Sequence, residues 1–202
     1  MPEEESIKTM ILGKTLYVTK RREWRAWLSK HHDTEKEIWL VYYRKDSGKP
    51  RIPYNHAVEE ALCYGWIDST LKKIDQESFA QRFSPRRPAS KLSEMNKERI
   101  RRLIARKKMT AAGLSAIQHV FDPTSVKIGE RSSTRLTVAP DILKALKDDA
   151  QTWKNFQRFP ASYKRIRIGW IEGTRKRPGE FKKRLRYFLK MTGQNKRFGM
   201  VQ

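Results

Sequence analysis

The stretch IWLVYYRKDSGKP at positions 38–50 decides the fold of the N-terminal part of this 202-residue chain. Its first six residues, Ile38 to Tyr43, are all aromatic or aliphatic, which is the composition and the length of a buried strand. The polar residues that follow, with Gly48 and Pro50, are typical of a turn. We therefore expect Ile38–Tyr43 to be the central strand of a sheet.

Helices and further strands are expected on both sides of this strand. Leu16–Thr19 has the composition of a short strand, and the helical spacing of Trp24, Trp27 and Leu28 follows it. Pro53 can open a helix over Tyr54–Tyr64, with Gly65 as its left-handed cap. The alternation in 71–83, around the polar turn 75–78, predicts a hairpin. The expected fold class is α+β, with a small antiparallel sheet packed with helices.

The remainder of the chain is expected to be helical. Ser93 can cap a helix that carries many basic residues up to Lys108. Residues 121–138 contain Pro, Gly and Ser without a helical period, which indicates a linker. Apolar residues then recur at helical spacing in Asp141–Leu146, Trp153–Phe159, Tyr163–Ile171 and Phe181–Leu189, with Pro160 and Pro178 as expected stops. We predict an α+β domain over 1–120, a linker over 121–138 and a helical C-terminal region over 139–202.

Positive charge is concentrated in two stretches. The formal net charge is +23, from 45 Lys and Arg against 22 Asp and Glu. Residues 82–108 have 11 basic and 2 acidic residues, and residues 158–197 have 14 basic and 2 acidic residues. An excess of this size attracts polyanions at long range. A solvated surface with ion-pair networks is the ordinary alternative, but such networks need both signs of charge.

Several classes of protein are disfavoured by what the sequence lacks. No apolar run approaches the roughly 18 to 20 residues that span a bilayer, and the acidic start lacks the basic region of a secretory signal, so we expect a cytoplasmic protein without membrane insertion. Cys63 is the only cysteine, which excludes an internal disulfide and a cysteine-rich zinc site, and it is expected to be buried. The four histidines have no metal-site spacing, and neither phosphate-binding glycine loops nor a nucleophile elbow occurs. We expect no metal, no cofactor and no catalytic set.

Two segments carry a family resemblance. They are AVEEALCYGWIDSTLKKID at 57–75 and QRFSPRRPASKLSEMNKERIRRLIARKKMTAAGLSAI at 81–117. Together with the weaker C-terminal motifs W-x-x-F (Trp153), P-x-S-Y (Pro160) and W-I-E (Trp170), this pattern resembles the YdeI/OmpD-associated family, also called bacteriocin-protection proteins. Leu92 departs from the family pattern, which has Trp there, so a role of that aromatic side chain is in doubt here. The family name implies stress or peptide tolerance and a link to an outer-membrane porin.

The candidate ligand-binding residues lie in the segments that carry this resemblance. The Asp-Ser pair of GWIDS could bind a polar group of a ligand or could cap local backbone, and the backbone role carries more weight. Prolines flank two adjacent arginines in PRRP, so each guanidinium group could donate two hydrogen bonds to an anion. An internal ion pair of either arginine with Asp68 or a glutamate is equally expected. The predicted site residues are Trp66, Asp68, Ser69, Gln81, Arg82, Arg86, Arg87, Asn96 and Arg99.

Three functions follow as hypotheses. The first is a protein without enzymatic activity whose basic surface binds an anionic partner, DNA or RNA before others, without strong sequence readout. The second is a stress protein that binds a small molecule or peptide in a pocket around GWIDS and QRFSPRRP. The third is an enzyme of unknown class, although no set of acid, base and nucleophile can be recognised in the sequence. Basic and aromatic residues also interleave between Tyr163 and Phe188, a pattern that suits single-stranded nucleic acid but is more typical of a helical core.

Overall fold

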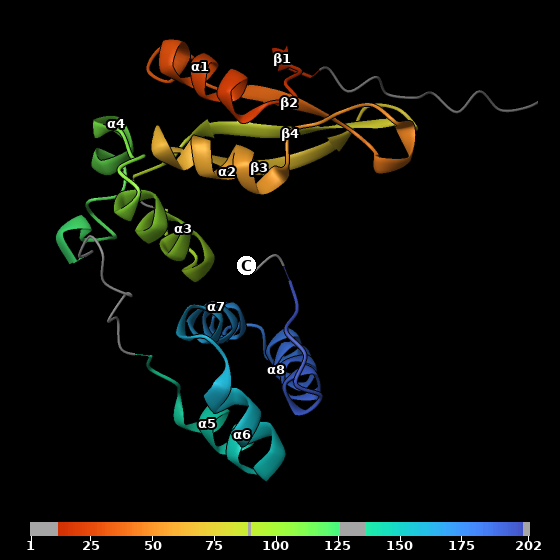
Figure 1. Ribbon diagram of the computed structural model, residues 1–202, viewed down its shortest axis with the longest axis vertical. Helices are drawn as coiled ribbons and strands as arrows, with labels where there is room; N and C mark the ends of the chain where they lie inside the picture. The colour runs from red at the N-terminus through yellow and green to blue at the C-terminus, as the bar shows by residue number, and fades with distance from the viewer. Residues whose placement is uncertain (1–11, 89, 126–135, 200–202) are drawn as a thin grey trace, which may run out of the picture. The chain divides into compact units, whose positions relative to one another are not determined.

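A computed structural model of the chain describes residues 12–88, 90–125 and 136–199 (Figure 1). Its contacts divide the chain into two compact units. The first unit comprises Met1–Ser90 and Lys107–His119, and the second comprises Lys91–Arg106 and Val120–Gln202. The expected fold class is confirmed, because the first unit contains a sheet with helices and the second contains only helices among its described residues.

Four strands form the sheet of the first unit, in the order β1-β2-β4-β3. The expected central strand is β2 (Ile38–Tyr43), which pairs antiparallel with β4 (Ser78–Pro85), and β4 pairs antiparallel with β3 (Trp66–Lys73). The expected first strand is shorter and earlier than predicted, as β1 (Thr15–Leu16), and it pairs parallel with β2. The sheet is therefore mixed rather than purely antiparallel, because a helix connects β1 to β2 and such a crossover allows parallel pairing.

Two helices pack beside this sheet. These are α1 (Arg21–His31) and α2 (Tyr54–Cys63), drawn next to the strands in Figure 1. Trp24 of α1 is fully buried, its indole Nε1 donates to the carbonyl of Ala57 at 3.0 Å, and its ring lies 5.4 Å from that of Phe83 on β4. Trp24 thus joins both helices to one face of the sheet, and the apolar spacing of α1 follows from this burial.

Gly65 ends α2 with a left-handed φ of +76°, as the sequence predicts. The turn η1 (Lys45–Ser47) follows β2. A short helix that we did not predict, α4 (Ala111–Ser115), also belongs to the first unit. A Cβ at Gly113 would lie 2.1 Å from the carbonyl oxygen of Cys63, so only glycine allows α4 to approach the end of α2 this closely.

The second unit contains five helices in its described part. They are α3 (Glu94–Ala105), α5 (Pro140–Lys147), α6 (Ala150–Arg158), α7 (Ala161–Glu172) and α8 (Pro178–Gly193). The four predicted C-terminal helices are therefore confirmed. Pro178 is the first residue of α8 rather than a stop. Proline is suited to this position because it lacks a backbone N–H, and the N–H groups of the first turn have no partner within the helix. The shared core of the C-terminal helices consists of Ile142, Leu146, Phe156, Phe159, Tyr163, Ile168, Ile171 and Phe188.

Helix α3 packs on α7, although α3 lies in the sequence between the two segments of the first unit. Glu98 of α3 accepts from Arg165 of α7 at 2.5 Å, and both side chains are more than nine-tenths buried. The predicted domain boundaries at 120 and 139 remain a prediction, and they would separate these two helices. Of the predicted linker 121–138, the structure shows a short helical turn η2 (Pro123–Ser125), and residues 126–135 lie outside its described part. None of the described helices is long and apolar enough to cross a membrane.

Candidate anion-binding site

The predicted site residues of the GWIDS motif are held within the first unit. Trp66 is buried, and its indole Nε1 donates to the carbonyl of His32 at 2.9 Å. The Asp68 carboxylate accepts from the Tyr54 hydroxyl at 2.6 Å. The Gln81 amide is buried and donates to the carbonyl of Ser69 at 3.1 Å, beside the irregularity in the β3–β4 register. These bonds satisfy polar groups within the first unit, and the partner of Asp68 is a side-chain hydroxyl rather than the local backbone that the sequence favoured.

Arg82 projects from β4 toward acidic and hydroxyl partners. Its guanidinium forms an ion pair with Glu37 at 2.6 Å, and Nη1 lies 3.5 Å from the hydroxyl of Ser69. The hydrogen bond from Arg82 holds the pKa of the Glu37 carboxyl below its ordinary value. Arg82 therefore has an acidic partner already.

The two arginines of PRRP have different environments. Arg86 is buried, Nη2 donates to the carbonyl of Ser90 at 2.5 Å, and Nε has no hydrogen-bond partner among the described residues. Burial lowers the pKa of Arg86, and no carboxylate of the described residues offsets that effect. Arg87 is exposed. The alternative of an internal ion pair between either arginine and Asp68 or a glutamate is not seen among the described residues, where Asp68 bonds Tyr54. Of the two arginines, only Arg87 presents its side chain to solvent.

Asn96 and Arg99 lie on α3 and so belong to the second unit. Arg99 is buried and donates to the Asn96 side-chain oxygen at 2.7 Å, one turn away. The predicted site residues are therefore divided between the two units, with Asn96 and Arg99 in the helical one.

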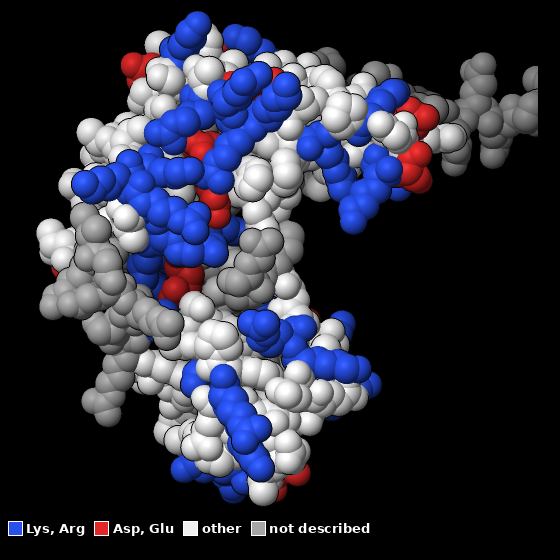
Figure 2. Space-filling view, viewed as in Figure 1, with Lys and Arg blue, Asp and Glu red and all other residues white. Residues whose placement is uncertain are grey.

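Most of the net charge belongs to the helical unit. It has 26 Lys and Arg against 9 Asp and Glu, a net charge of +17, whereas the first unit has 19 against 13, a net charge of +6. Figure 2 shows Lys and Arg side chains over the visible face of α5–α8, with little Asp or Glu among them. Both basic stretches contribute to this unit, since the basic helix α3 belongs with the basic C-terminal helices.

The acidic residues of the helical unit are mostly occupied by internal partners. Glu98 bonds Arg101 as well as Arg165, Asp141 and Glu172 bond Arg175, and Glu180 bonds Arg184. Asp149 caps α6 by accepting from the backbone N–H of Thr152 at 2.6 Å. These carboxylates therefore offset few of the exposed cations.

Helix α8 presents the clearest exposed basic face. Lys182, Lys183, Arg186 and Lys190 are all exposed, and none of them forms an ion pair with a described residue. Lys182, Arg186 and Lys190 follow one another at four-residue intervals, which places them along one side of the helix. We call these four residues the α8 basic face.

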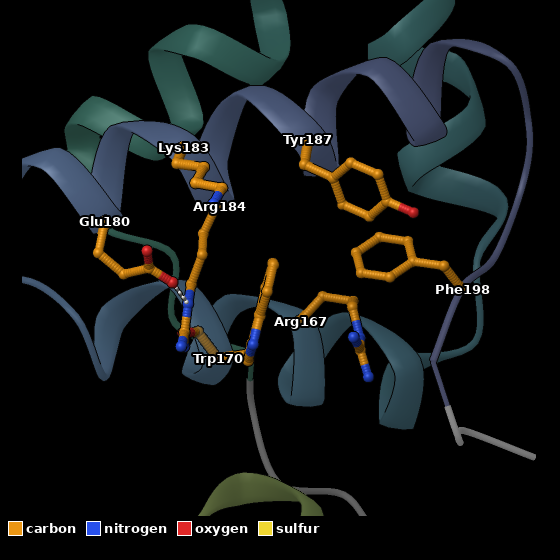
Figure 3. A pocket seen from close by; sticks show the side chains of 7 residues that line it. All are labelled: Arg167, Trp170, Glu180, Lys183, Arg184, Tyr187 and Phe198. Carbon is orange, nitrogen blue, oxygen red and sulfur yellow. Dashed lines mark hydrogen bonds and ion pairs between the residues drawn. The ribbon is translucent and has the colours of Figure 1, made fainter. Parts of the chain in front are cut away.

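A cavity of about 370 Å³ lies between α7, α8 and the segment that follows α8 (Figure 3). Arg167 and Trp170 of α7 line one side, and four residues of α8 line another. Phe198 contributes the remaining aromatic wall. The α8 residues are Glu180, Lys183, Arg184 and Tyr187.

Aromatic rings define the walls of this cavity. The ring of Phe198 meets those of Tyr187 and Trp170 edge to face, at centroid distances of 4.8 and 5.7 Å. Tyr187 remains 44% exposed. Arg184 lies 4.7 Å from the Trp170 ring centroid and is held there by Glu180, as the dashed line in Figure 3 shows. The walls are therefore flat, aromatic and bordered by cations.

Arg167 is the most unusual residue of the cavity. It is 5% exposed, its Nε has no hydrogen-bond partner, and it forms no ion pair with a described residue. Burial lowers the pKa of its guanidinium. Two rings lie beside its guanidinium, Phe198 at 4.7 Å and Tyr163 at 5.6 Å, and the backbone of Gly199 is close enough that a Cβ there would lie 2.9 Å from both Nη atoms. A buried cation that lacks an anionic partner favours a ligand with an acceptor group.

Part of the cavity lining coincides with residues singled out from the sequence. Arg167, Trp170, Arg184 and Tyr187 lie in the interleaved basic and aromatic stretch, which we weighted toward a core. Tyr163 and Phe188 are indeed core residues. Glu180, Lys183 and Phe198 were missed, and the only available signal was the continuation of the interleaving as far as Phe198. Among the described residues, no group of three His, Cys, Asp or Glu side chains could hold a metal ion.

Comparison with known families finds one match in the N-terminal part of the chain and another in the C-terminal part. Residues 16–116, half of the chain, match the model of a domain of unknown function (DUF8412). Residues 135–195 match the model described as bacteriocin-protection, YdeI or OmpD-associated. The chain belongs to the DUF8412 family and carries a YdeI/OmpD-associated C-terminal region. The resemblance to YdeI/OmpD-associated proteins is thus confirmed through the helical tail, whereas the GWIDS and PRRP motifs fall in the DUF8412 match.

Comparisons with curated proteins and with solved structures found no match. The α8 basic face and every residue that lines the cavity, apart from Phe198, lie within the YdeI/OmpD-associated region.

Proposed function

We propose that this chain is a binding protein rather than an enzyme, and that it binds nucleic acid without strong sequence readout. The observation that carries the proposal is the net charge of +17 on the helical unit, together with the exposed and unpaired α8 basic face. Phosphate contacts by Lys and Arg supply most of the affinity in nonspecific nucleic-acid binding. A nucleic-acid partner also fits the cytoplasmic location that we propose.

The helical unit is a better candidate for this surface than the PRRP segment. Arg86 is buried, so PRRP offers only Arg87 to a phosphate, whereas α8 offers four cations along one helix. The rival hypothesis of a small-molecule pocket around GWIDS is not favoured, because Trp66, Asp68 and Gln81 all have internal hydrogen-bond partners.

Salt dependence tests the proposal. Affinity for single- and double-stranded DNA and RNA should be measured by fluorescence anisotropy between about 50 and 200 mM salt, where the logarithm of affinity falls by about 0.7 to 0.9 for each neutralised phosphate per decade of salt. Replacing Lys182, Lys183, Arg186 and Lys190 by Gln should weaken binding to all sequences alike. The salt dependence should become shallower by up to about three units, because each lost contact removes its share.

A matched control removes the same number of exposed cations from the first unit, with Arg22, Lys30, Lys36 and Lys45 replaced by Gln. This variant should retain most of the affinity. Failure of the wild-type protein to bind any of these nucleic acids at about 50 mM salt would contradict the proposed function. An equal loss in the control variant would overturn the assignment to α8 alone.

A further inference from the structure

We propose that the cavity between α7 and α8 binds an unpaired base, so that the nucleic acid recognised by this protein is single-stranded. The inference rests on the proposed function and names its substrate class. It draws on three independent features of the cavity: the aromatic walls, the unsatisfied Arg167 and the continuity with the α8 basic face.

The walls suit the flat surface of a base. Tyr187 exposes nearly half of its surface beside the cavity, and its ring is fixed by the edge-to-face contact with Phe198 (Figure 3). A fixed and exposed aromatic ring offers a stacking platform to any base, because every base has a π-face. A volume of about 370 Å³ is at the small end of ligand cavities, which fits one base with its sugar rather than a larger ligand.

Arg167 supplies positive charge beside such a base. Its side chain lines the cavity, and its guanidinium lies beside Phe198 and Trp170 in the wall. All four bases carry acceptor nitrogen or oxygen atoms on their edges, so this cation favours a bound base without sequence selection.

Continuity with the α8 basic face points to a polymer rather than a free nucleotide. Lys183 belongs both to this face and to the lining of the cavity, and Arg186 and Lys190 lie on either side of Tyr187 along the helix. A strand whose base enters the cavity therefore meets cations for its neighbouring phosphates. The bases of a duplex are stacked and paired inside the helix, and they reach such a cavity only after unpairing.

An oligonucleotide that lacks bases separates stacking from charge. We compare a single-stranded oligodeoxythymidine with an abasic oligomer of equal length, which has the same phosphates and no bases. Wild-type protein should bind the oligodeoxythymidine about five- to 150-fold more tightly, the range expected for stacking of one base. In Tyr187→Ala this preference should fall to near unity, whereas Tyr187→Phe, which keeps the ring, should retain it.

Tyr17→Ala is the matched control, because Tyr17 is 43% exposed and belongs to the first unit. It should keep the full preference for bases. Urea unfolding of each variant confirms that it is folded. If wild-type protein binds both oligomers equally, the base site is wrong and the proposed function stands. If it binds neither oligomer and none of the other single- or double-stranded nucleic acids, the proposed function fails as well. A duplex bound as tightly as the single strand would also overturn the base site.

Discussion

Single residues show how burial determines which groups are available for chemistry. Cys63 is fully buried at the end of α2, as expected from the sequence, and burial raises the pKa of its thiol to about 11. Glu60 adds to this rise, while Arg25 opposes it. Two effects therefore make Cys63 unreactive. The raised pKa keeps the thiol protonated, and burial keeps reagents from reaching the sulfur.

The thiol gives two measurable consequences. Cys63 should react slowly with thiol reagents until the protein unfolds, and rapid labelling of the native protein would reopen the hypothesis of an enzyme. Because the native thiol holds its proton at a pH where the unfolded thiol has lost it, its contribution to stability is present below about pH 9 and is lost as the pH rises toward 11. The free energy of unfolding, measured in urea, should fall between pH 8 and pH 10. This fall should be larger by roughly 1 kcal/mol in wild type than in Cys63→Ala. Equal falls would contradict the raised pKa.

Pairs of elements show how the helical unit is assembled. Gly169 of α7 faces Glu94 of α3 so closely that a Cβ at position 169 would lie 2.3 Å from the Glu94 Cγ. The buried Glu98–Arg165 pair lies between the same two helices. Removing one partner of a buried pair is costly, so the packing and the charges together define how α3 meets α7.

Substitution of Gly169 tests this contact. Gly169→Ala should destabilise the helical unit by about 1 to 3 kcal/mol, because the methyl group forces α3 and α7 apart. Gly179→Ala is the control, since a Cβ at that position in the first turn of α8 has no atom within 4 Å. It should be neutral or slightly stabilising. Urea unfolding gives the size of each effect, and faster hydrogen exchange in α3 and α7 of Gly169→Ala would locate it. Unchanged exchange in both helices would contradict the contact.

At the scale of the whole molecule, the order of segments along the chain differs from their grouping in space. Helix α3 and residues up to Arg106 belong to the helical unit, and the chain then returns to the first unit before it enters the helical unit again at Val120. Each unit is therefore built from two separate segments. Because the chain passes three times between the units, one cut in the chain does not separate them.

Limited proteolysis tests this grouping. We expect the first cut within 125–138, where the sequence is rich in small and polar residues, and residues 126–135 of that stretch lie outside the described part. After this cut the two fragments should still elute together in size-exclusion chromatography, because α3 remains packed on α7. Glu98→Gln should promote their separation, since Arg165 would lose a buried carboxylate. Dissociation of the nicked wild-type protein would contradict the grouping, and an initial cut inside Ile38–Tyr43 would contradict the position of that strand.

Local sequence patterns predicted most of the helices and strands, and composition predicted a positively charged surface. The continuous apolar run at Ile38–Tyr43 predicted β2, and helical periodicity predicted α1, α2, α3 and the four C-terminal helices. These signals are local, because periodicity depends only on residues within a few turns or strand positions of one another. Net charge is equally a property of composition, so the expectation of an anionic partner needed no coordinates.

Which of these residues contact one another became known only from the three-dimensional structure. The parallel pairing of β1, the transfer of α3 to the helical unit and the different burial of Arg86 and Arg87 all depend on contacts between residues far apart in sequence. The same holds for the cavity, where Phe198 comes back to Tyr187 and Arg167. Whether a charge is buried, paired or exposed is a matter of its three-dimensional neighbours, and local periodicity does not contain that information.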